Sequence, residues 1–379
     1  MDDAKKYEVA IIGGGLAGLG LAIGLCKKGY SVVLFEKERY PFHKVCGEYI
    51  SLESLEHLEY LGLPIKEMDL PIIKKLVVSA PSGNLLTASL PLGGFGISRY
   101  YLDDTLRKIA IAQGVVIFEG CKVEDVRFDG ENFYLTTRCG NFASSICCGS
   151  FGKRSNIDHT LKRNFIRKKN TKPGNYIGVK YHVKMNHPAD TIALHNFANG
   201  YCGISKIEDN KYCLCYLTTA EQLKKNRNSI ADLERKVLFT NPHLQKIFTE
   251  SEFLFDQPVT ISQISFSKKS QVEAHILLLG DAAGMITPLC GNGMSMALHS
   301  GKIAGSFIDQ FLQQEITRSE MELLYVKKWR STFSKRLMAG RMIQNGFGKN
   351  AVTNILIAGL KQFPFLTKWI IRNTHGHPF

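Results

Sequence analysis

Residues 13–18 read G-G-G-L-A-G, a G-x-G-x-x-G pattern that lies between two apolar segments. The segment before it, Glu8–Ile12, is predicted as a buried strand, and Leu16–Lys27 after it as a helix. Ser31–Phe35 is predicted as a second strand, and Glu36 follows it directly. A β-α-β unit of this kind implies a parallel sheet covered by other elements, so the sequence predicts a Rossmann-like α/β domain.

These positions are the ones that dinucleotide binding requires, because an acid lies about 20 residues after the glycines. Gly13 permits a tight turn, and Gly15 lets backbone N–H groups approach a pyrophosphate. Gly18 lets the helix pack closely on the strand, and Glu36 is expected to accept hydrogen bonds from the adenosine ribose. The pattern alone does not separate FAD from NAD, and a glycine-rich turn without a ligand is the plain alternative.

A second glycine-rich segment, residues 280–284, reads G-D-A-A-G and follows a predicted strand at Ile276–Leu279. Together with the residues after it, it resembles the ribityl-binding segment of glutathione-reductase-type flavoproteins, which include aromatic hydroxylases and geranylgeranyl reductases. The resemblance implies an FAD cofactor, an Asp that bonds the ribityl chain, and a helix N-terminus that points at the flavin pyrimidine ring. The residues that it assigns to the cofactor here are Gly280, Asp281, Pro288, Gly291 and Gly293.

Two further segments resemble the same family. Residues 99–106 resemble its R-x-x-L-D-x-x-L helix start, which implies that Arg99 lies near the FAD. Residues 43–48, H-K-V-C-G-E, resemble the C-G-E segment of geranylgeranyl reductases, which implies that His43 and Cys46 line the reaction site as candidate catalytic residues. A surface charge at Arg99 and a packed small thiol at Cys46 are the plain alternatives.

The resemblance covers most of residues 7–310, and three departures bear on function. Phe151 occupies the position of the Asp in the hydroxylases' G-A-D-G segment, which weighs against their manner of NADPH use. Tyr201 alone remains of the lipid reductases' Y-x-W-x-F-P segment. The halogenases' W-x-W-x-I-P segment is missing, since the tryptophans of the chain are Trp329 and Trp369.

Alternation of apolar and polar residues from about 176 to 265 predicts a mostly antiparallel sheet, inserted into the first domain as a substrate domain. The tail after it is predicted to be helical and basic. The expected boundaries are 1–75, 95–160 and 266–318 for a discontinuous FAD-binding domain, 76–94 and 161–265 for the substrate domain, and 319–379 for the C-terminal segment.

The net charge of +14 is concentrated in residues 153–172 and in the tail after Glu322, which has no acid. A basic surface suits acidic partners, but no nucleic-acid-binding pattern accompanies it, so nucleic acid is not an expected partner. The ten cysteines include no C-x-x-C pair, so neither a metal site nor a disulfide framework is expected. The N-terminus lacks the layout of a signal peptide, and a reduced, cytoplasmic protein is expected.

Residues 355–371 are apolar but are broken by Lys361, Pro364 and Lys368. They fall short of the roughly 20 apolar residues that a membrane span needs. A packed helix is the prediction, and peripheral contact of the basic C-terminal segment with a membrane, through Trp369 and the lysines, is the alternative.

The sequence therefore favours an FAD-dependent oxidoreductase that reduces carbon–carbon double bonds of a lipophilic, isoprenoid or polyene-like substrate. The alternatives are an FAD-dependent monooxygenase that hydroxylates an aromatic or polyketide-like molecule, and a non-catalytic flavin electron-transfer protein at a membrane surface. No second G-x-G-x-x-G pattern has the strand and acid of a nicotinamide domain. The expected electron donor is NAD(P)H that binds at the surface, or a reduced electron carrier.

Overall fold

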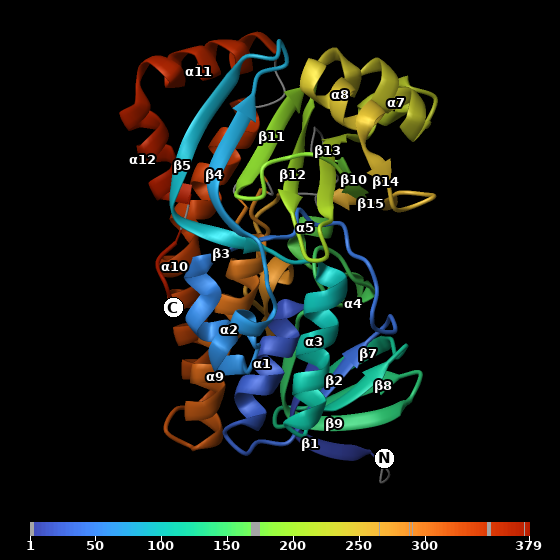
Figure 1. Ribbon diagram of the computed structural model, residues 1–379. Helices are drawn as coiled ribbons and strands as arrows, with labels where there is room; N and C mark the ends of the chain where they lie inside the picture. Colours follow the sequence, from blue (N-terminus) through green and yellow to red (C-terminus); the bar gives the residue numbers. More distant parts are fainter. Residues whose placement is uncertain are drawn as a thin grey trace.

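The computed structural model describes residues 4–167, 175–264, 266–287, 289, 291–346, 350–374 and 376–379. Two β-sheets lie one above the other along the long axis of the molecule (Figure 1). The first holds the N-terminal strand, and the second lies at the opposite end, beside the C-terminal helices. This arrangement is a mixed α/β fold, as the sequence predicts.

The first sheet has the strand order β16-β17-β9-β1-β2-β6, and β7 and β8 extend it from β9. The pairs β1–β2, β1–β9, β9–β17 and β2–β6 are parallel. Its strands are β1 (Lys5–Ile12), β2 (Val32–Glu36), β6 (Val116–Glu119), β7 (Val123–Phe128), β8 (Phe133–Thr137), β9 (Gly140–Gly149), β16 (Val272–Glu273) and β17 (Ile276–Leu278).

The second sheet has the order β14-β10-β13-β12-β11-β4-β5-β3, with β15 paired to β10. Among the strand pairs that the described residues form in this sheet, only β4 and β11 are parallel, so the sheet is mostly antiparallel, as the alternation predicts. Its strands are β3 (Tyr49–Ser51), β4 (Ile72–Ser79), β5 (Leu85–Gly96), β10 (Tyr176–Lys184), β11 (Thr191–Phe197), β12 (Gly200–Lys206), β13 (Tyr212–Thr219), β14 (Glu252–Phe253) and β15 (Val259–Ile264).

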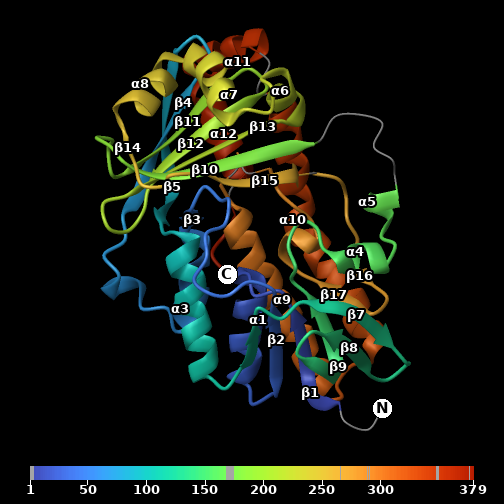
Figure 2. The ribbon, with the colours of Figure 1, turned by 90° about the vertical axis from the view of Figure 1, so that its right-hand side faces the viewer.

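Helices surround both sheets. They are α1 (Leu16–Cys26), η1 (Leu52–Ser54), α2 (Leu55–Leu61), η2 (Ile65–Glu67), α3 (Arg99–Ala112), α4 (Asn156–Thr160), α5 (Asn164–Arg167), α6 (Ala220–Lys225), α7 (Ile230–Lys236), η3 (Leu238–Thr240), α8 (Pro242–Glu250), η4 (Gly280–Ala282), α9 (Gly293–Leu312), α10 (Arg318–Gly346), α11 (Asn350–Gln362) and α12 (Pro364–Thr374). The helices α1 and α3 lie to one side of the parallel strands, and the β7–β8 hairpin lies to the other (Figure 2).

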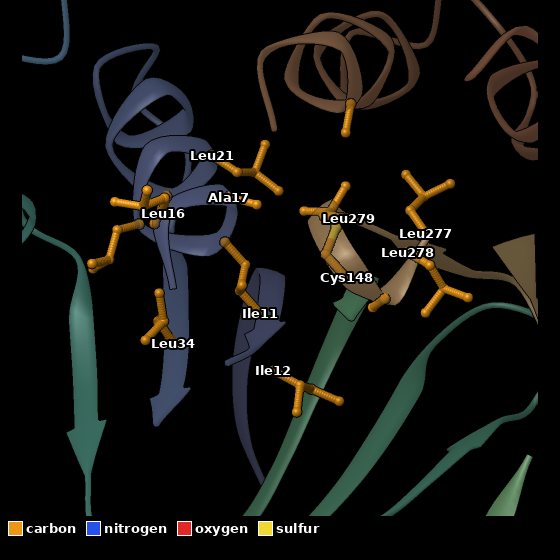
Figure 3. Close-up of a cluster of buried hydrophobic side chains, with 14 of the residues drawn as sticks. Ile11, Ile12, Leu16, Ala17, Leu21, Leu34, Cys148, Leu277, Leu278 and Leu279 are labelled. Carbon is orange, nitrogen blue, oxygen red and sulfur yellow. The ribbon is translucent and has the colours of Figure 1, made fainter. Parts of the chain in front are cut away.

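The main hydrophobic core lies between the parallel strands and the helices α1 and α9. Ile11 of β1, Leu34 of β2 and Leu21 of α1 point into it, together with Leu277 and Leu279 near the start of the second glycine-rich segment (Figure 3). Because residues 9–12 of β1 and the apolar residues of β2 and β17 are buried, the ends of these strands are fixed relative to one another. The loops that follow the strands are therefore held at one edge of the sheet.

The two faces of the second sheet differ. On one face Val179 and Tyr181 of β10 share a core with Leu233 of α7 and Leu244 of α8. The opposite face is directed toward the first sheet and toward α11 and α12, which lie beside β4 and β5 (Figure 1). Ile371 of α12 belongs to an apolar cluster on this second face.

Cys121 and Cys139 form a disulfide with Cα atoms 6.1 Å apart, which corrects the expectation of an entirely reduced set of cysteines. The pairing of β8 with both β7 and β9 brings the two residues together, and sequence spacing does not show this.

The domain boundaries stay a prediction. The strand β3, at Tyr49–Ser51, pairs with β5 in the second sheet, although residues 1–75 were assigned to the FAD-binding domain. Within the described ranges, no helix is both long enough and apolar enough to cross a membrane.

The contact between α1 and α9 depends on a glycine. A Cβ atom at Gly301 would lie 2.7 Å from the carbonyl oxygen of Ala17, whereas one at Gly24, also within a helix, would have no atom within 4 Å. We expect Gly301→Ala to lower the free energy of unfolding by about 1–3 kcal/mol, because the helices must move apart. The control Gly24→Ala should leave it unchanged or raise it by up to about 1 kcal/mol through helix propensity. Denaturant titrations of both variants measure this, and equal stabilities would contradict the packing argument.

Candidate active site

The residues predicted to bind the cofactor meet at the carboxyl ends of neighbouring parallel strands. Gly13 follows β1, Glu36 ends β2, and Gly280 and Asp281 follow β17. The end of β9, at Gly149, lies between β1 and β17. In open parallel sheets this edge is where ligands bind.

The turn between β1 and α1 is shaped by close backbone approach. Gly13 has a φ of 105°, and a Cβ atom there would clash with the carbonyl oxygen of Ser150. Gly15 is the N-cap of α1, and no side chain caps this helix. The nearest atom to a Cβ at Gly15 is Nη2 of Arg99, at 3.9 Å. The first N–H groups of α1 are therefore available to an anion beside Gly15. Gly18 lies one turn later, where a Cβ would clash with the carbonyl oxygen of Gly13.

Glu36 is buried at the edge of this turn, with 6% of its surface exposed. Its Oε2 accepts a hydrogen bond from the N–H of Gly14 at 2.8 Å, and its Oε1 accepts one from Glu38 at 3.1 Å. A carboxylate has about four acceptor positions, so it can accept further hydrogen bonds from hydroxyl groups.

Arg99, the first residue of α3, forms a bidentate ion pair with Asp103. Its Nε donates to Oδ1 at 2.7 Å and its Nη2 to Oδ2 at 2.8 Å, and Lys44 Nζ lies 2.8 Å from the same Oδ2. Burial by itself raises the pKa of Asp103, but the charges of Arg99 and Lys44 outweigh it and hold this pKa below its usual range. Two cations against one anion leave a net positive charge beside Gly15, which suits a pyrophosphate.

Asp281 lies in η4, on the other side of the same edge. Burial raises the pKa of its carboxyl group, and the charges of Lys269, Arg99 and Lys153 oppose this rise. Lys269 Nζ donates to the carbonyl oxygens of Asp281, at 2.8 Å, and Lys153, at 2.7 Å. Burial lowers the pKa of Lys269 and that of Lys153 to about 8 each.

The loop after η4 leads into α9, whose N-terminus has no side-chain cap. Gly293 is the first residue of this helix. At Gly291 a Cβ atom would lie 3.2 Å from the Tyr49 ring, so the loop that carries Cys46 and Glu48 borders the loop that leads into α9. Pro288 lies outside the described residues. These positions stay predictions as cofactor contacts.

A group of buried charges that sequence analysis missed lies beside Cys46. Glu48 is fully buried, and its carboxylate accepts hydrogen bonds from Lys180 Nζ and from the backbone N–H of Arg99, the latter at 2.7 Å. Its Oε2 lies 2.7 Å from His182 Nε2. Burial alone raises the pKa of Glu48, but Lys180 and His182 outweigh it and hold this pKa below its usual range.

The sequence did carry a signal for this group. Lys180 and His182 alternate with apolar residues on β10, and such residues point to the same face of a sheet. Two basic side chains on one face of an otherwise buried strand need a partner, because unpaired buried charges are costly. The identity of that partner, Glu48, is not visible from spacing.

The two candidate catalytic residues differ in surroundings. The ring of His43 stacks on Tyr100, with centroids 4.5 Å apart, and lies 4.7 Å from Phe255 and 5.1 Å from His182. Cys46 is half-buried, burial raises the pKa of its thiol, and its carbonyl oxygen accepts a hydrogen bond from Cys213 Sγ. A raised pKa favours the neutral thiol over the nucleophilic thiolate. The structure brings both residues beside Glu48, and their catalytic roles stay predictions.

Comparisons with known proteins agree with this geometry. The family model described as "FAD binding domain" matches residues 6–313. A menaquinone reductase of Mycobacterium tuberculosis is 22% identical over 331 residues, which are 82% of this chain and 78% of that protein. A geranylgeranyl bacteriochlorophyll reductase-like protein from Thermoplasma acidophilum superimposes with a TM-score of 0.77 at 17% identity, over 98% of this chain and 100% of that one.

The flavin-dependent halogenase CmlS also superimposes, with a TM-score of 0.77 at 22% identity. The match covers 89% of this chain and 64% of that chain, so the chain spans less than two thirds of CmlS. At these identities the structural likeness establishes the fold. The open turn at Gly15, the acid at Glu36 and the uncapped N-termini of α1 and α9 fit an FAD molecule.

Because the backbone at Gly15 faces open space, a substitution there should weaken cofactor binding without changing the stability of the fold. We expect Gly15→Val to fold with the thermal stability of the FAD-free wild type, because among the described residues the new Cβ atom would have only Arg99 Nη2 near it, at 3.9 Å. The dissociation constant of FAD should rise at least 100-fold in this variant, because the side chain would occupy the path of the pyrophosphate. Flavin absorbance after gel filtration, with thermal unfolding of both apoproteins, measures this. Full flavin occupancy in the variant would contradict the assignment of this turn.

Proposed function

The chain belongs to the FAD-binding domain family and is an FAD-dependent enzyme, and from this premise we propose that it reduces a carbon–carbon double bond of a lipophilic, isoprenoid or polyene-like substrate. When bound and reduced, FAD supplies two electrons and a proton to such a bond. The residues proposed to hold FAD are Gly13, Gly15, Gly18, Glu36, Arg99, Gly280, Asp281, Gly291 and Gly293.

An apolar contact between the flavin-motif loop and the second sheet carries this proposal. Leu289 and Met285, which follow η4, share a cluster with Tyr201 of β12 and Leu217 of β13. Further apolar clusters on the same face of the sheet reach Ile357 of α11 and Ile371 of α12. A lipophilic molecule bound against this face would gain about 25 cal/mol for each Å² of apolar surface that it buries.

The polar side of the site supports a reductase over a monooxygenase. Adding two electrons to a double bond also requires a proton, and Glu48, Lys180 and His182 lie beside Cys46 to position donors of one. Phe151, at the end of β9, stands where the hydroxylases carry an Asp. The menaquinone reductase and the reductase-like structure among the similar proteins agree with this choice.

For the electron donor we propose NAD(P)H that binds transiently, or a reduced electron carrier with an acidic surface. Lys153, whose charge acts on Asp281, is half-buried, and its neighbour Arg154 is exposed. A basic rim next to the flavin motif attracts phosphate groups and carboxylates alike, so it accommodates either donor.

Rapid mixing separates the reductase from its alternatives. We expect the anaerobically reduced protein to be reoxidised by oxygen slowly and in one step. A component of a cell lipid extract should reoxidise it faster without oxygen, because the electrons then pass to a double bond. Stopped-flow absorbance of the flavin follows both reactions. A spectral intermediate that forms only with oxygen would favour the monooxygenase, and failure of every extract to reoxidise the flavin would favour non-catalytic electron transfer.

We also propose that the C-terminal helices contact an anionic lipid surface. Ile355 of α11 and Phe365 and Trp369 of α12 are exposed to 74%, 65% and 63%. Lys361 and Arg372 are exposed nearby, and the sequence has no Asp or Glu after Glu322. Apolar side chains next to unopposed positive charge are the pattern of helices that lie in a membrane interface. Such contact would give the enzyme access to a lipophilic substrate.

Vesicle binding tests this surface. We expect Phe365→Ser combined with Trp369→Ser to reduce co-sedimentation with phosphatidylglycerol vesicles about 10-fold, because less apolar area enters the lipid. Leu323→Ser is the control, since this leucine is 67% exposed but lies at the opposite end of the C-terminal segment, in α10. Vesicles of phosphatidylcholine alone should bind the wild type weakly. Equal binding of the double variant and the control would contradict the proposal.

A further inference from the structure

His43 has a buried hydrogen-bonding atom that the described residues leave unpaired. No hydrogen-bond partner lies within reach of its Nδ1 in the described structure. The rings of Tyr100, Phe255 and His182 surround the imidazole, so its orientation is fixed by packing. Buried polar atoms in native proteins are almost always paired, and a bound molecule or a water can complete the pairing of such an atom.

The groups around His43 already have partners. His182 Nε2 lies 2.7 Å from Glu48, and Lys180 Nζ donates to Glu48 and to the carbonyl oxygen of Lys44, at 3.2 Å for the latter. Because the Glu48 carboxylate has no proton to give at neutral pH, His182 Nε2 must be the donor in that contact. His43 is the residue of this group that has a buried nitrogen with no partner among the described residues.

His43 is also in a defined protonation state. Burial, reinforced by the charges of Lys180 and His182, lowers the pKa of His43 to about 4, against the opposing effect of Glu48. The imidazole is therefore neutral at physiological pH and has one N–H donor. A neutral imidazole can donate a hydrogen bond to an oxygen without adding a buried charge.

The position of His43 places this donor beside the proposed flavin site. Its loop continues to Glu48, whose carboxylate fixes the backbone of Arg99, and Arg99 lies over Gly15. The same loop ends at Tyr49, which contacts Gly291 just before α9. A substrate held between the flavin and the second sheet would have His43 on its polar side.

We infer that the substrate carries a carbonyl group conjugated with the double bond, as in an enone, and that His43 Nδ1 donates a hydrogen bond to the carbonyl oxygen. This inference rests on the proposed reductase function and names its substrate class. An isolated alkene would leave the orphan atom unpaired. A conjugated carbonyl oxygen accepts a hydrogen bond from His43 Nδ1, and the conjugation also activates the double bond toward reduction.

The electrons balance for such a substrate. The β-carbon receives two electrons and one proton from the reduced cofactor, which the donor has reduced beforehand. The π electrons of the double bond shift toward the carbonyl, whose oxygen accepts the hydrogen bond from His43 Nδ1 and carries the developing negative charge. The α-carbon then takes a proton from water, which restores the carbonyl, and His43 keeps its proton throughout. Overall, one carbon–carbon double bond, two electrons and two protons are converted into one saturated carbon–carbon bond.

Ligand titration tests the inference without turnover. The probes are β-ionone, which is a conjugated ketone, and the hydrocarbon in which its carbonyl is replaced by a methylene group. Each is titrated into the oxidised holoprotein under anaerobic conditions, and binding is read from the flavin absorption and fluorescence. We expect β-ionone to bind about 10-fold more tightly, since one hydrogen bond without a desolvation loss is worth roughly that factor.

Two variants at position 43 separate the hydrogen bond from packing. His43→Phe keeps the ring that stacks on Tyr100 and removes both nitrogens, so the preference for β-ionone should fall to about one. His43→Asn places an amide near the position of Nδ1 and should retain most of the preference. His275→Gln is the control, because this histidine pairs with Glu322 at an exposed turn. All three should retain full flavin occupancy, which shows that they fold.

The outcomes keep this inference apart from the proposed function. Equal binding of the two probes, binding of neither, or an unchanged preference in His43→Phe would overturn the inference. Tight, His43-dependent binding of β-ionone supports it even when the reduced protein never reduces the conjugated double bond. Binding of β-ionone without its reduction would contradict the proposed reductase function, whereas the inference of a carbonyl-binding site at His43 would stand.

Discussion

The buried carboxylate of Glu48 joins the two halves of this protein. Its partners come from the N-terminus of α3 and from β10, so one side chain connects the loops of the first sheet with the face of the second. The backbone of Glu48 has a φ of 54°, a left-handed conformation that costs on the order of 1 kcal/mol for a residue with a side chain. That conformation persists because several hydrogen bonds fix the carboxylate at once, and removal of Lys180 would leave the buried carboxylate without the cation that lies against it.

The electrostatics of the site follow from the same junction. Arg99 and Lys44 hold Asp103 ionised, and Lys153 and Lys269 oppose the effect of burial on Asp281. The uncapped N-termini of α1 and α9 add partial positive charge. The first sheet thus gathers positive potential where a dinucleotide with a pyrophosphate and a reducible ring would lie, while the second sheet presents an apolar face beside it.

The sequence predicted the FAD-binding family and the α/β class because their signals are local. The glycines at 13, 15 and 18 and the acid at 36 act through a turn, a close approach and a strand end, each set within a short segment. The observed helix α1, Leu16–Cys26, ends within one residue of the predicted helix Leu16–Lys27 for the same reason. The Cys121–Cys139 disulfide was missed, because only the pairing of β7, β8 and β9 brings these residues together.

The sequence alone therefore determined the FAD-binding family, the α/β class and the mostly antiparallel second sheet, since hydrophobic periodicity and glycine spacing report local geometry. The tertiary structure alone decided which charges neutralise one another. Glu48 and Lys180 are 132 residues apart, and the orphan nitrogen of His43 lies between rings from α3, from β10 and from the segment after β14. Contacts at such separations depend on how two sheets pack, and a single sequence carries no periodic signal for that packing.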